Sequence, residues 1–121
     1  MIEACGGGKF EIVKLLLERT ETKLNTTDNQ GGTALMWACY NGHKDVVQLL
    51  LNSSDKDIEL NTRNNRGHTA FKLACYYGHK DIVQLLLKCS DKNIELNTGD
   101  NKGWTAFMLA CYYGHKDVVQ L

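Results

Sequence analysis

Three cysteine and histidine pairs are the residues of this chain that could carry chemistry. In each pair a His follows a Cys by four residues, and the pairs are Cys39 with His43, Cys75 with His79, and Cys111 with His115. Thiolate and imidazole are both zinc ligands. The pairs recur 36 residues apart, however, and equivalent atoms of stacked units lie roughly 8–10 Å apart, too far to share a zinc ion with ligands at about 2 Å. We therefore expect no metal site.

Each unit also offers an acid or base, because Asp45, Asp81 and Asp117 lie two residues after the three histidines. An active site needs unlike groups that converge on one pocket, whereas these groups recur once per unit. The glycines of residues 6–8 are not followed by the Lys-Ser/Thr of a phosphate-binding loop. We expect no catalytic activity, no cofactor and no small-molecule substrate.

These groups recur because a longer block of sequence recurs. The block T-A-[LF]-x-x-A-C-Y-x-G-H-K-D-[VI]-V-Q-L begins at Thr33, Thr69 and Thr105. Self-similarity at a 36-residue spacing indicates a protein built of stacked repeats. In each unit the Thr can cap a short helix with an apolar stripe, and the Gly after it can take the left-handed conformation that ends a helix. A second, amphipathic helix follows directly.

The segments between the helix pairs are polar and then alternate between apolar and polar residues, as in residues 58–61. An Asn/Gly-rich stretch, residues 64–67, closes this alternation. The pattern predicts a short β-hairpin arm in each unit.

The order of arm, helix, tight turn and helix resembles the ankyrin repeat, whose pattern is D-x-x-G-x-T-P-L-H-x-A-A-x-x-G-H-x-E-V-V-x-L-L-L. The matching residues of one copy are Gly67, Thr69, Phe71, Ala74, Cys75, Gly78, His79, Asp81, Val83 and the leucines 85–87. The same matches recur over residues 31–51 and 103–121, and a degenerate copy lies over 4–17. The resemblance covers about three and a half repeats, essentially the whole chain.

The resemblance implies an all-α fold with short β-hairpin loops, an ankyrin-repeat solenoid of stacked helix-turn-helix units. We expect a single array over residues 1–121, divided into a partial repeat 1–24, repeats 25–60 and 61–96, and a truncated repeat 97–121. Its core should be a ribbon of Leu, Val, Ala and Cys between helix layers. Both ends interrupt a repeat, so we expect a piece of a longer protein, and a monomer that can associate end to end through its uncapped repeats.

The chain departs from the family pattern in three places. Ala34, Ala70 and Ala106 replace the Pro, and Met36, Lys72 and Met108 replace the first His of the pattern. Each replacement removes a feature that fixes the start of the first helix. Surplus residues at 53–56 and 90–93 predict a longer loop between the second helix and the arm.

Composition restricts the class of partner and the compartment. Fourteen acidic and fourteen basic side chains cancel, which removes the broad positive field that non-specific binding to nucleic acid or anionic membranes needs. No stretch approaches a membrane span, and the N-terminus does not resemble a signal peptide. The odd number of cysteines, five, favours reduced thiols over a disulfide framework. We expect a cytoplasmic protein, with the nucleus as the alternative.

The resemblance also implies where a partner binds, namely a concave groove formed by arm tips and first helices. In the first complete unit the groove positions are Asn29, Gln30, Gly32, Tyr40 and Asn41. In the later units the expected partner-binding residues are Arg63, Asn65, Arg66, His68, Tyr76, Tyr77, Asn101, Lys102, Trp104, Tyr112 and Tyr113. Tyr and Trp are over-represented among interface hot spots. The strictly periodic tyrosines have a second interpretation, that they stack on one another as part of the scaffold.

Two functions are compatible with these residues. The first is a non-catalytic module that binds a protein or peptide partner on the concave face. The alternative is a targeting or regulatory segment of a larger enzyme, channel or effector. The resemblance further implies that an asparaginyl hydroxylase could modify the Asn that closes the first part of each arm, namely Asn25, Asn61 and Asn97.

Overall fold

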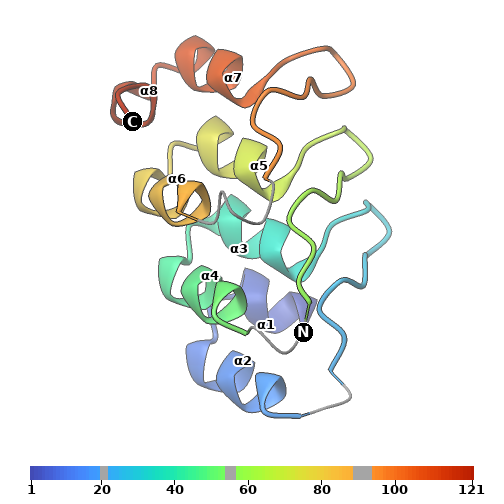
Figure 1. Ribbon diagram of the computed structural model, residues 1–121. Helices are drawn as coiled ribbons and strands as arrows, with labels where there is room; N and C mark the ends of the chain where they lie inside the picture. The colour runs from blue at the N-terminus through green and yellow to red at the C-terminus, as the bar shows by residue number, and fades with distance from the viewer. Residues whose placement is uncertain (20–21, 54–56, 89–93) are drawn as a thin grey trace.

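The computed structural model describes residues 1–19, 22–53, 57–88 and 94–121. Within these ranges the chain forms helices in successive pairs and no β-strand, which confirms the all-α solenoid class. The helices are α1 (Ile2–Gly6), α2 (Phe10–Leu17), α3 (Ala34–Asn41), α4 (Lys44–Leu51), α5 (Ala70–Tyr76), α6 (Lys80–Leu87), α7 (Ala106–Tyr112) and α8 (Lys116–Val119). Figure 1 shows the pairs stacked one above another from the N-terminus to the C-terminus.

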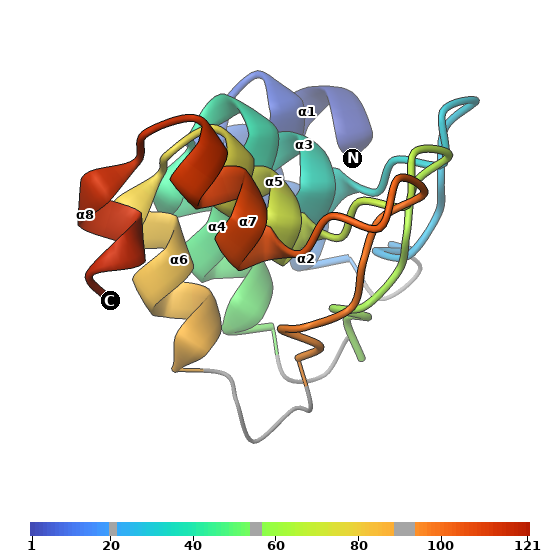
Figure 2. The ribbon, with the colours of Figure 1, turned by 90° about the horizontal axis from the view of Figure 1, so that it is seen from above.

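The helices form two layers. The first helices α1, α3, α5 and α7 pack in succession, and so do the second helices α2, α4, α6 and α8. The connecting arms project to one side of the helix layers, which is clearest in the view along the stack (Figure 2).

Each of α3, α5 and α7 begins at a threonine cap. The Oγ1 of Thr33, Thr69 and Thr105 accepts a hydrogen bond from the backbone N–H three residues later, at 3.2, 3.2 and 3.3 Å. The cap needs only a hydroxyl and a backbone donor, so it survives the replacement of the family's Pro and His. The start of the first helix is retained for this reason.

Neighbouring pairs interlock through a histidine and a glycine, a contact that we call the His–Gly socket. His43, His79 and His115 donate from Nε2 to the carbonyl oxygens of Gly6, Tyr40 and Tyr76, at 3.0, 3.1 and 2.6 Å. Each ring lies against a glycine of the preceding pair, so a Cβ added to Gly8, Gly42 or Gly78 would come within 2.7, 2.7 or 2.5 Å of it. These glycines also have positive φ angles, so both backbone and space exclude a larger residue.

The core is a continuous buried cluster between the layers. It contains Cys5, Cys39 and Cys75 together with leucines, valines and alanines from successive pairs. A buried thiol behaves as a small apolar group, which explains why these cysteines occupy close-packed positions. The expected ribbon of small and branched residues is present.

The arms differ from the expected β-hairpins. In the described part of the chain they contain tight turns rather than paired strands. The backbone N–H of Asn64 donates to His68 O at 2.9 Å and that of Gly67 donates to Asn64 O at 2.9 Å. These bonds close a single turn, so the Asn/Gly-rich stretch at residues 64–67 predicted the position of the turn correctly. The alternating residues 58–61 do not pair as a β-strand. The predicted longer loops lie largely outside the described residues, at 54–56 and 89–93.

Candidate partner-binding groove

One Asp or Asn holds each arm turn in shape. The side-chain Oδ1 of Asp28 accepts hydrogen bonds from the backbone N–H of Gln30 and of Gly32 at 3.0 and 2.8 Å. Asn64 and Asp100 make the same two bonds in their own turns, at 3.0 and 3.0 Å and at 2.9 and 2.9 Å. A side-chain acceptor at this place mimics a backbone turn. The turn tips are therefore preorganised.

Successive turns are joined to one another. Asn65 donates from its backbone to Gln30 O at 2.9 Å and from Nδ2 to Asn29 O at 3.2 Å. Asn101 repeats both contacts one unit later, to Arg66 O at 3.1 Å and to Asn65 O at 2.7 Å. The side chains of Asn65 and Asn101, which we expected to bind a partner, thus already have partners within the array.

Arg63 also bridges two repeats instead of facing the groove. Its Nη2 donates to the carbonyl oxygen of Gly99 at 2.7 Å, and the residue does not line the groove. Its expected role in partner binding is therefore not supported by its position. Arginine provides several donors in a fixed fork, which suits such a bridge between turns.

The floor of the groove is filled by complementary pairs of large and small residues. In the first complete unit Gly32 leaves room for Trp37, because a Cβ on Gly32 would lie 2.7 Å from Trp37 Nε1. In the next units the larger residue comes from the arm, with His68 beside α5 and Trp104 beside α7. The first helix then provides Leu73 or Leu109 at the equivalent place. Packing thus explains why the residue before the capping threonine differs from repeat to repeat, as Gly32, His68 and Trp104.

His68 is one of these packing residues. It is 8% exposed, and its Nε2 lies 3.0 Å from Asp100 Oδ2 of the following turn. Trp37 makes the corresponding contact inside its own unit, donating from Nε1 to Asp28 Oδ2 at 2.7 Å. His68 thus lines the groove but already has a partner, so its divergence from the repeat indicates a structural contact.

Aromatic side chains form a continuous row along the wall of the groove, which we call the aromatic strip. Its members, in contact order, are Trp37, Tyr40, Tyr77, Tyr76, Tyr113, Tyr112 and Trp104, with ring centroids 5.4, 4.6, 4.5, 4.6, 4.9 and 5.1 Å apart. Aromatic pairs at such separations attract one another beyond their burial of area. The strip therefore spans three repeats as one surface.

The periodic tyrosines Tyr40, Tyr76 and Tyr112 were expected either to bind a partner or to stack on one another, but the ring contacts between repeats join Tyr40 and Tyr76 to tyrosines at other repeat positions. Tyr40 contacts Tyr77, and Tyr76 contacts Tyr113 with the two hydroxyls 3.0 Å apart. The stacking between repeats is therefore diagonal and pairs each periodic tyrosine with the residue 37 positions later. Much of the strip remains accessible, since Tyr77 is 39% and Tyr112 is 69% exposed. The tyrosines support one another and still present a surface.

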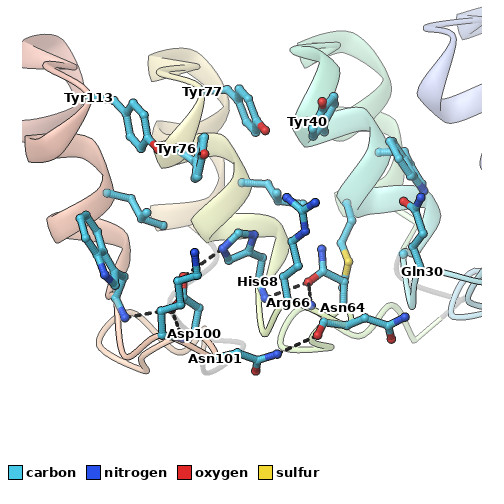
Figure 3. A pocket seen from close by; sticks show the side chains of 18 of the residues that line it. Gln30, Tyr40, Asn64, Arg66, His68, Tyr76, Tyr77, Asp100, Asn101 and Tyr113 are labelled. Carbon is cyan, nitrogen blue, oxygen red and sulfur yellow. Dashed lines mark hydrogen bonds and ion pairs between the residues drawn. The ribbon is translucent and has the colours of Figure 1, made fainter.

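The groove between strip and turns has a volume of about 1120 Å³. Figure 3 shows labelled side chains from arm and helix directed toward it, with Arg66 extending from its turn toward the tyrosines. All the residues that we expected to bind a partner, except Arg63, line this groove, and so do Gln30, Gly32 and Tyr40. Asn29 and Asn41 do not. Asn41 instead donates from Nδ2 to Gly6 O at 2.9 Å.

Sequence reasoning missed the residues of the floor. They are Met36, Trp37, Asn64, Leu73, Asp100 and Leu109. A signal was available for three of them, because Trp37, Leu73 and Leu109 occupy one repeat position, four residues after the capping threonine. These three apolar residues were not among the expected groove positions.

The titratable groups of the groove are held in defined charge states. The Gly32 amide lowers the pKa of Asp28 most, and Trp37 adds to this effect. Burial acts to raise the pKa of Asp100, but the amides of Trp104 and Lys102 and the His68 side chain together lower it. Both carboxylates are thus ionised at neutral pH.

The charges of two groove cations reach the strip. Burial, and then the Tyr40 hydroxyl, raises the pKa of Tyr77 to about 12 against the opposing charge of Arg66. The hydrogen bond with Tyr76 raises the pKa of Tyr113 against the opposing charge of Lys102. Both tyrosines remain neutral hydrogen-bonding groups at neutral pH.

The three histidines first considered as metal ligands, and the buried Cys39 and Cys75, serve the scaffold. The histidines are engaged in the His–Gly sockets, and no group of three or more His, Cys, Asp or Glu within the described ranges could hold a metal ion. Burial raises the pKa of Cys75 to about 12 and that of Cys5 to about 11, and it raises the pKa of Cys39 as well. Thiols held in the protonated state are poor nucleophiles and poor ligands. None of the described helices is long and apolar enough to cross a membrane.

Comparison with known proteins places this geometry in a family. A family model described as ankyrin repeats (3 copies) matches residues 1–64 and 56–121. Similar proteins include osteoclast-stimulating factor 1 of Monopterus albus, 41% identical over 58 residues that cover 48% of this chain and 27% of that protein. Human ankyrin repeat and SAM domain-containing protein 3 is 44% identical over 46 residues, 38% of this chain and 7% of that protein.

Another similar protein is the human NAD-capped RNA hydrolase NUDT12, 43% identical over 49 residues, which cover 39% of this chain and 11% of that enzyme. The matched segments thus span about a quarter or less of these relatives. Because the family model covers both halves of the stack, the chain belongs to the ankyrin repeat family.

Proposed function

We propose that the chain is a non-catalytic module that binds a protein or peptide partner in the groove between the arm turns and the first helices. Ankyrin repeats are a protein-interaction module, and the groove is a hollow of about 1120 Å³ between arms and first helices. The same scaffold accommodates unrelated ligands, so the particular surface determines the partner.

The observation that carries the proposal is the aromatic strip. Exposed tyrosines are normally scattered, whereas here they are contiguous over three repeats and are already ordered by contacts with each other. A partner would therefore gain a large amphipathic contact surface without the entropic cost of ordering it. The polar turn tips opposite the strip provide hydrogen-bonding groups for the rim.

Affinity capture from a cell lysate with matched variants tests this proposal. Tyr112 and Phe107 are both exposed aromatics of α7, but only Tyr112 lines the groove. We expect Tyr112→Ala and Trp104→Ala to lose the captured proteins, and Phe107→Ala to retain them, while thermal melting confirms that all variants are folded. Equal capture by Tyr112→Ala and the unaltered protein would show that the groove is not the binding surface.

The alternative is that these repeats target or regulate a larger protein. It is supported by relatives that are several times longer than the matched segment, among them an enzyme. We also propose a reducing compartment, cytoplasm or nucleus, because Cys5, Cys39 and Cys75 are buried free thiols. The sequence of the full reading frame and fluorescence microscopy of a tagged chain would test these two proposals.

Asparagine hydroxylation is a separate proposal about the arms. Asn25 donates from Nδ2 to Asp57 O at 3.0 Å and accepts from the backbone of Glu59 at 2.8 Å. Asn61 accepts in the same way from Glu95 at 2.8 Å, whereas Asn97 is exposed. We expect an asparaginyl hydroxylase to add oxygen first at Asn97, and an unchanged intact mass after incubation would refute the proposal.

A further inference from the structure

Two cations occupy the same position on successive arm turns. Gln30, Arg66 and Lys102 are 36 residues apart, and all three line the groove. Figure 3 shows Arg66 reaching from its turn into the space in front of the tyrosines. The charge of Arg66 acts on Tyr77 and that of Lys102 acts on Tyr113. Both cations therefore line the same groove as the aromatic strip.

The carboxylates of the arm turns, Asp28 and Asp100, are hydrogen-bonded to groups other than these cations. Asp28 accepts from two backbone amides and from Trp37, and Asp100 accepts from two backbone amides and from His68. Over the described ranges, the ion pair that the structure contains in the groove is that of His68 and Asp100. Arg66 and Lys102 have no carboxylate within ion-pair distance there.

A third basic side chain, Lys72, is buried behind the turns. Lys72 is 1% exposed, and its Nζ lies 3.5 Å from Gly67 O, a long hydrogen bond. Burial lowers the pKa of Lys72, and the charge of Arg63 adds to this effect, whereas Asp100 and Glu95 oppose it. Lys72 does not line the groove, so Arg66 and Lys102 are the lysine and arginine side chains that a ligand there could contact.

We propose that the groove binds an extended acidic peptide whose carboxylates meet Arg66 and Lys102 while its apolar side chains lie on the aromatic strip. The proposal rests on the proposed function and names the chemistry of the partner. Charge complementarity of this kind sets specificity and steers association. It also explains how a chain with no net charge can select an acidic ligand, because the selection depends on two charges in one place.

The spacing of the cations indicates the spacing of the acids. Equivalent groups on packed repeats are separated by roughly 8–10 Å. A polyproline II segment rises about 3.1 Å per residue with three residues per turn, so side chains three residues apart share one face about 9 Å apart. Two acidic residues separated by two apolar ones therefore match the two turns, as in Asp-Pro-Leu-Glu.

Single-stranded nucleic acid is the competing polyanion, because such ligands also use aromatic stacking and positive grooves. It brings one phosphate charge per nucleotide and requires a row of cations along its path. The groove offers two exposed cations, Arg66 and Lys102, rather than a continuous row. The arrangement thus favours a ligand with few, spaced charges.

A random peptide library displayed on phage, panned against the intact chain, tests the proposal. Recovered peptides are then synthesised with a fluorescein label, and their affinities are measured by fluorescence polarisation. We expect net acidic peptides with carboxylates three residues apart, and affinities that fall as salt is raised. A labelled single-stranded oligonucleotide serves as the second probe.

Arg66→Gln and Lys102→Gln are the informative variants, because Gln30 naturally occupies the same position in the preceding repeat. Only the side chain of Arg66 changes, so its backbone bond to Asn101 is retained. Each variant should weaken an acidic peptide about fivefold. Lys80→Gln, an equal change of charge at an exposed residue of α6 outside the groove, should leave the affinity unchanged.

The outcomes separate this inference from the proposed function. Neutral or basic peptides that lose affinity in Tyr112→Ala would overturn the acidic ligand and leave groove binding intact. Acidic peptides that bind Tyr112→Ala as they bind the unaltered chain would overturn both. Failure to recover any peptide, or tighter binding of the oligonucleotide than of the recovered peptides, would also overturn the acidic peptide.

Discussion

Replacing Gly42 by Ala should destabilise the array through two separable effects. Gly42 has a φ of 76°, a conformation that costs an L-residue about 1 kcal/mol or more. The new Cβ would also lie 2.7 Å from Cε1 and 2.9 Å from Nδ1 of the His79 ring. The ring must move, and its 3.1 Å hydrogen bond to Tyr40 O is then weakened or lost, which costs about 1 kcal/mol.

We therefore expect Gly42→Ala to lower the free energy of unfolding by about 2–3 kcal/mol. Urea denaturation followed by circular dichroism measures this change. Gly114→Ala is the matched control for the backbone effect, because Gly114 has a φ of 73° but a Cβ added to it would meet no atom within 4 Å. It should cost only the first of the two terms, about 1 kcal/mol.

A double-mutant cycle with His79→Ala isolates the His–Gly socket. In a background without the imidazole, Gly42→Ala should cost about 1 kcal/mol less than in the unaltered chain, because the clash and the hydrogen bond are both absent. Effects of the two substitutions that add to within about 0.5 kcal/mol would refute the socket as an energetic unit.

Burial and charge lead to three further predictions. Lys72→Met should raise the melting temperature, because it removes an ammonium group from a side chain that is only 1% exposed. Methionine already occupies the equivalent position of the preceding repeat, as Met36. A lower melting temperature would contradict this prediction. Folding lowers the pKa of Asp28, so its ionised carboxylate stabilises the array above pH about 4, and this contribution is lost as the pH falls further. In Asp28→Asn the melting temperature, measured by calorimetry, should therefore change less between pH 5 and pH 3 than in the unaltered chain. Iodoacetamide should label the exposed Cys111 rapidly and the buried Cys39 only in denaturant, as peptide mass spectrometry would show.

The repeat period predicted the helices because their capping and packing residues recur. Thr33 as a cap and Gly42 as a helix end are local signals, and each was placed correctly from sequence. The wall of the groove followed from the resemblance, since Tyr76, Tyr77 and Tyr113 occupy first-helix positions.

Contacts between unlike residues of neighbouring repeats could not be read from the period. His68 looked available for a partner, but it bonds to Asp100 of the following turn. Arg63 likewise donates to the Gly99 carbonyl oxygen, because stacking brings the arms of consecutive repeats within reach of each other's side chains. Trp37 was not among the expected groove residues, and it reaches Asp28 of the turn past Gly32, which has no side chain to block it.

The His–Gly socket gives the array a standard connector. An internal unit such as residues 61–96 contains both partners of the contact. Its His79 packs on Gly42 of the preceding unit, and its Gly78 receives His115 of the following unit. A tandem duplication of its 36 codons would therefore join to both neighbours without new contacts having to evolve. Each inserted copy would lengthen the aromatic strip and the row of turn tips by one step, so recombination could tune the length of ligand that the surface accepts.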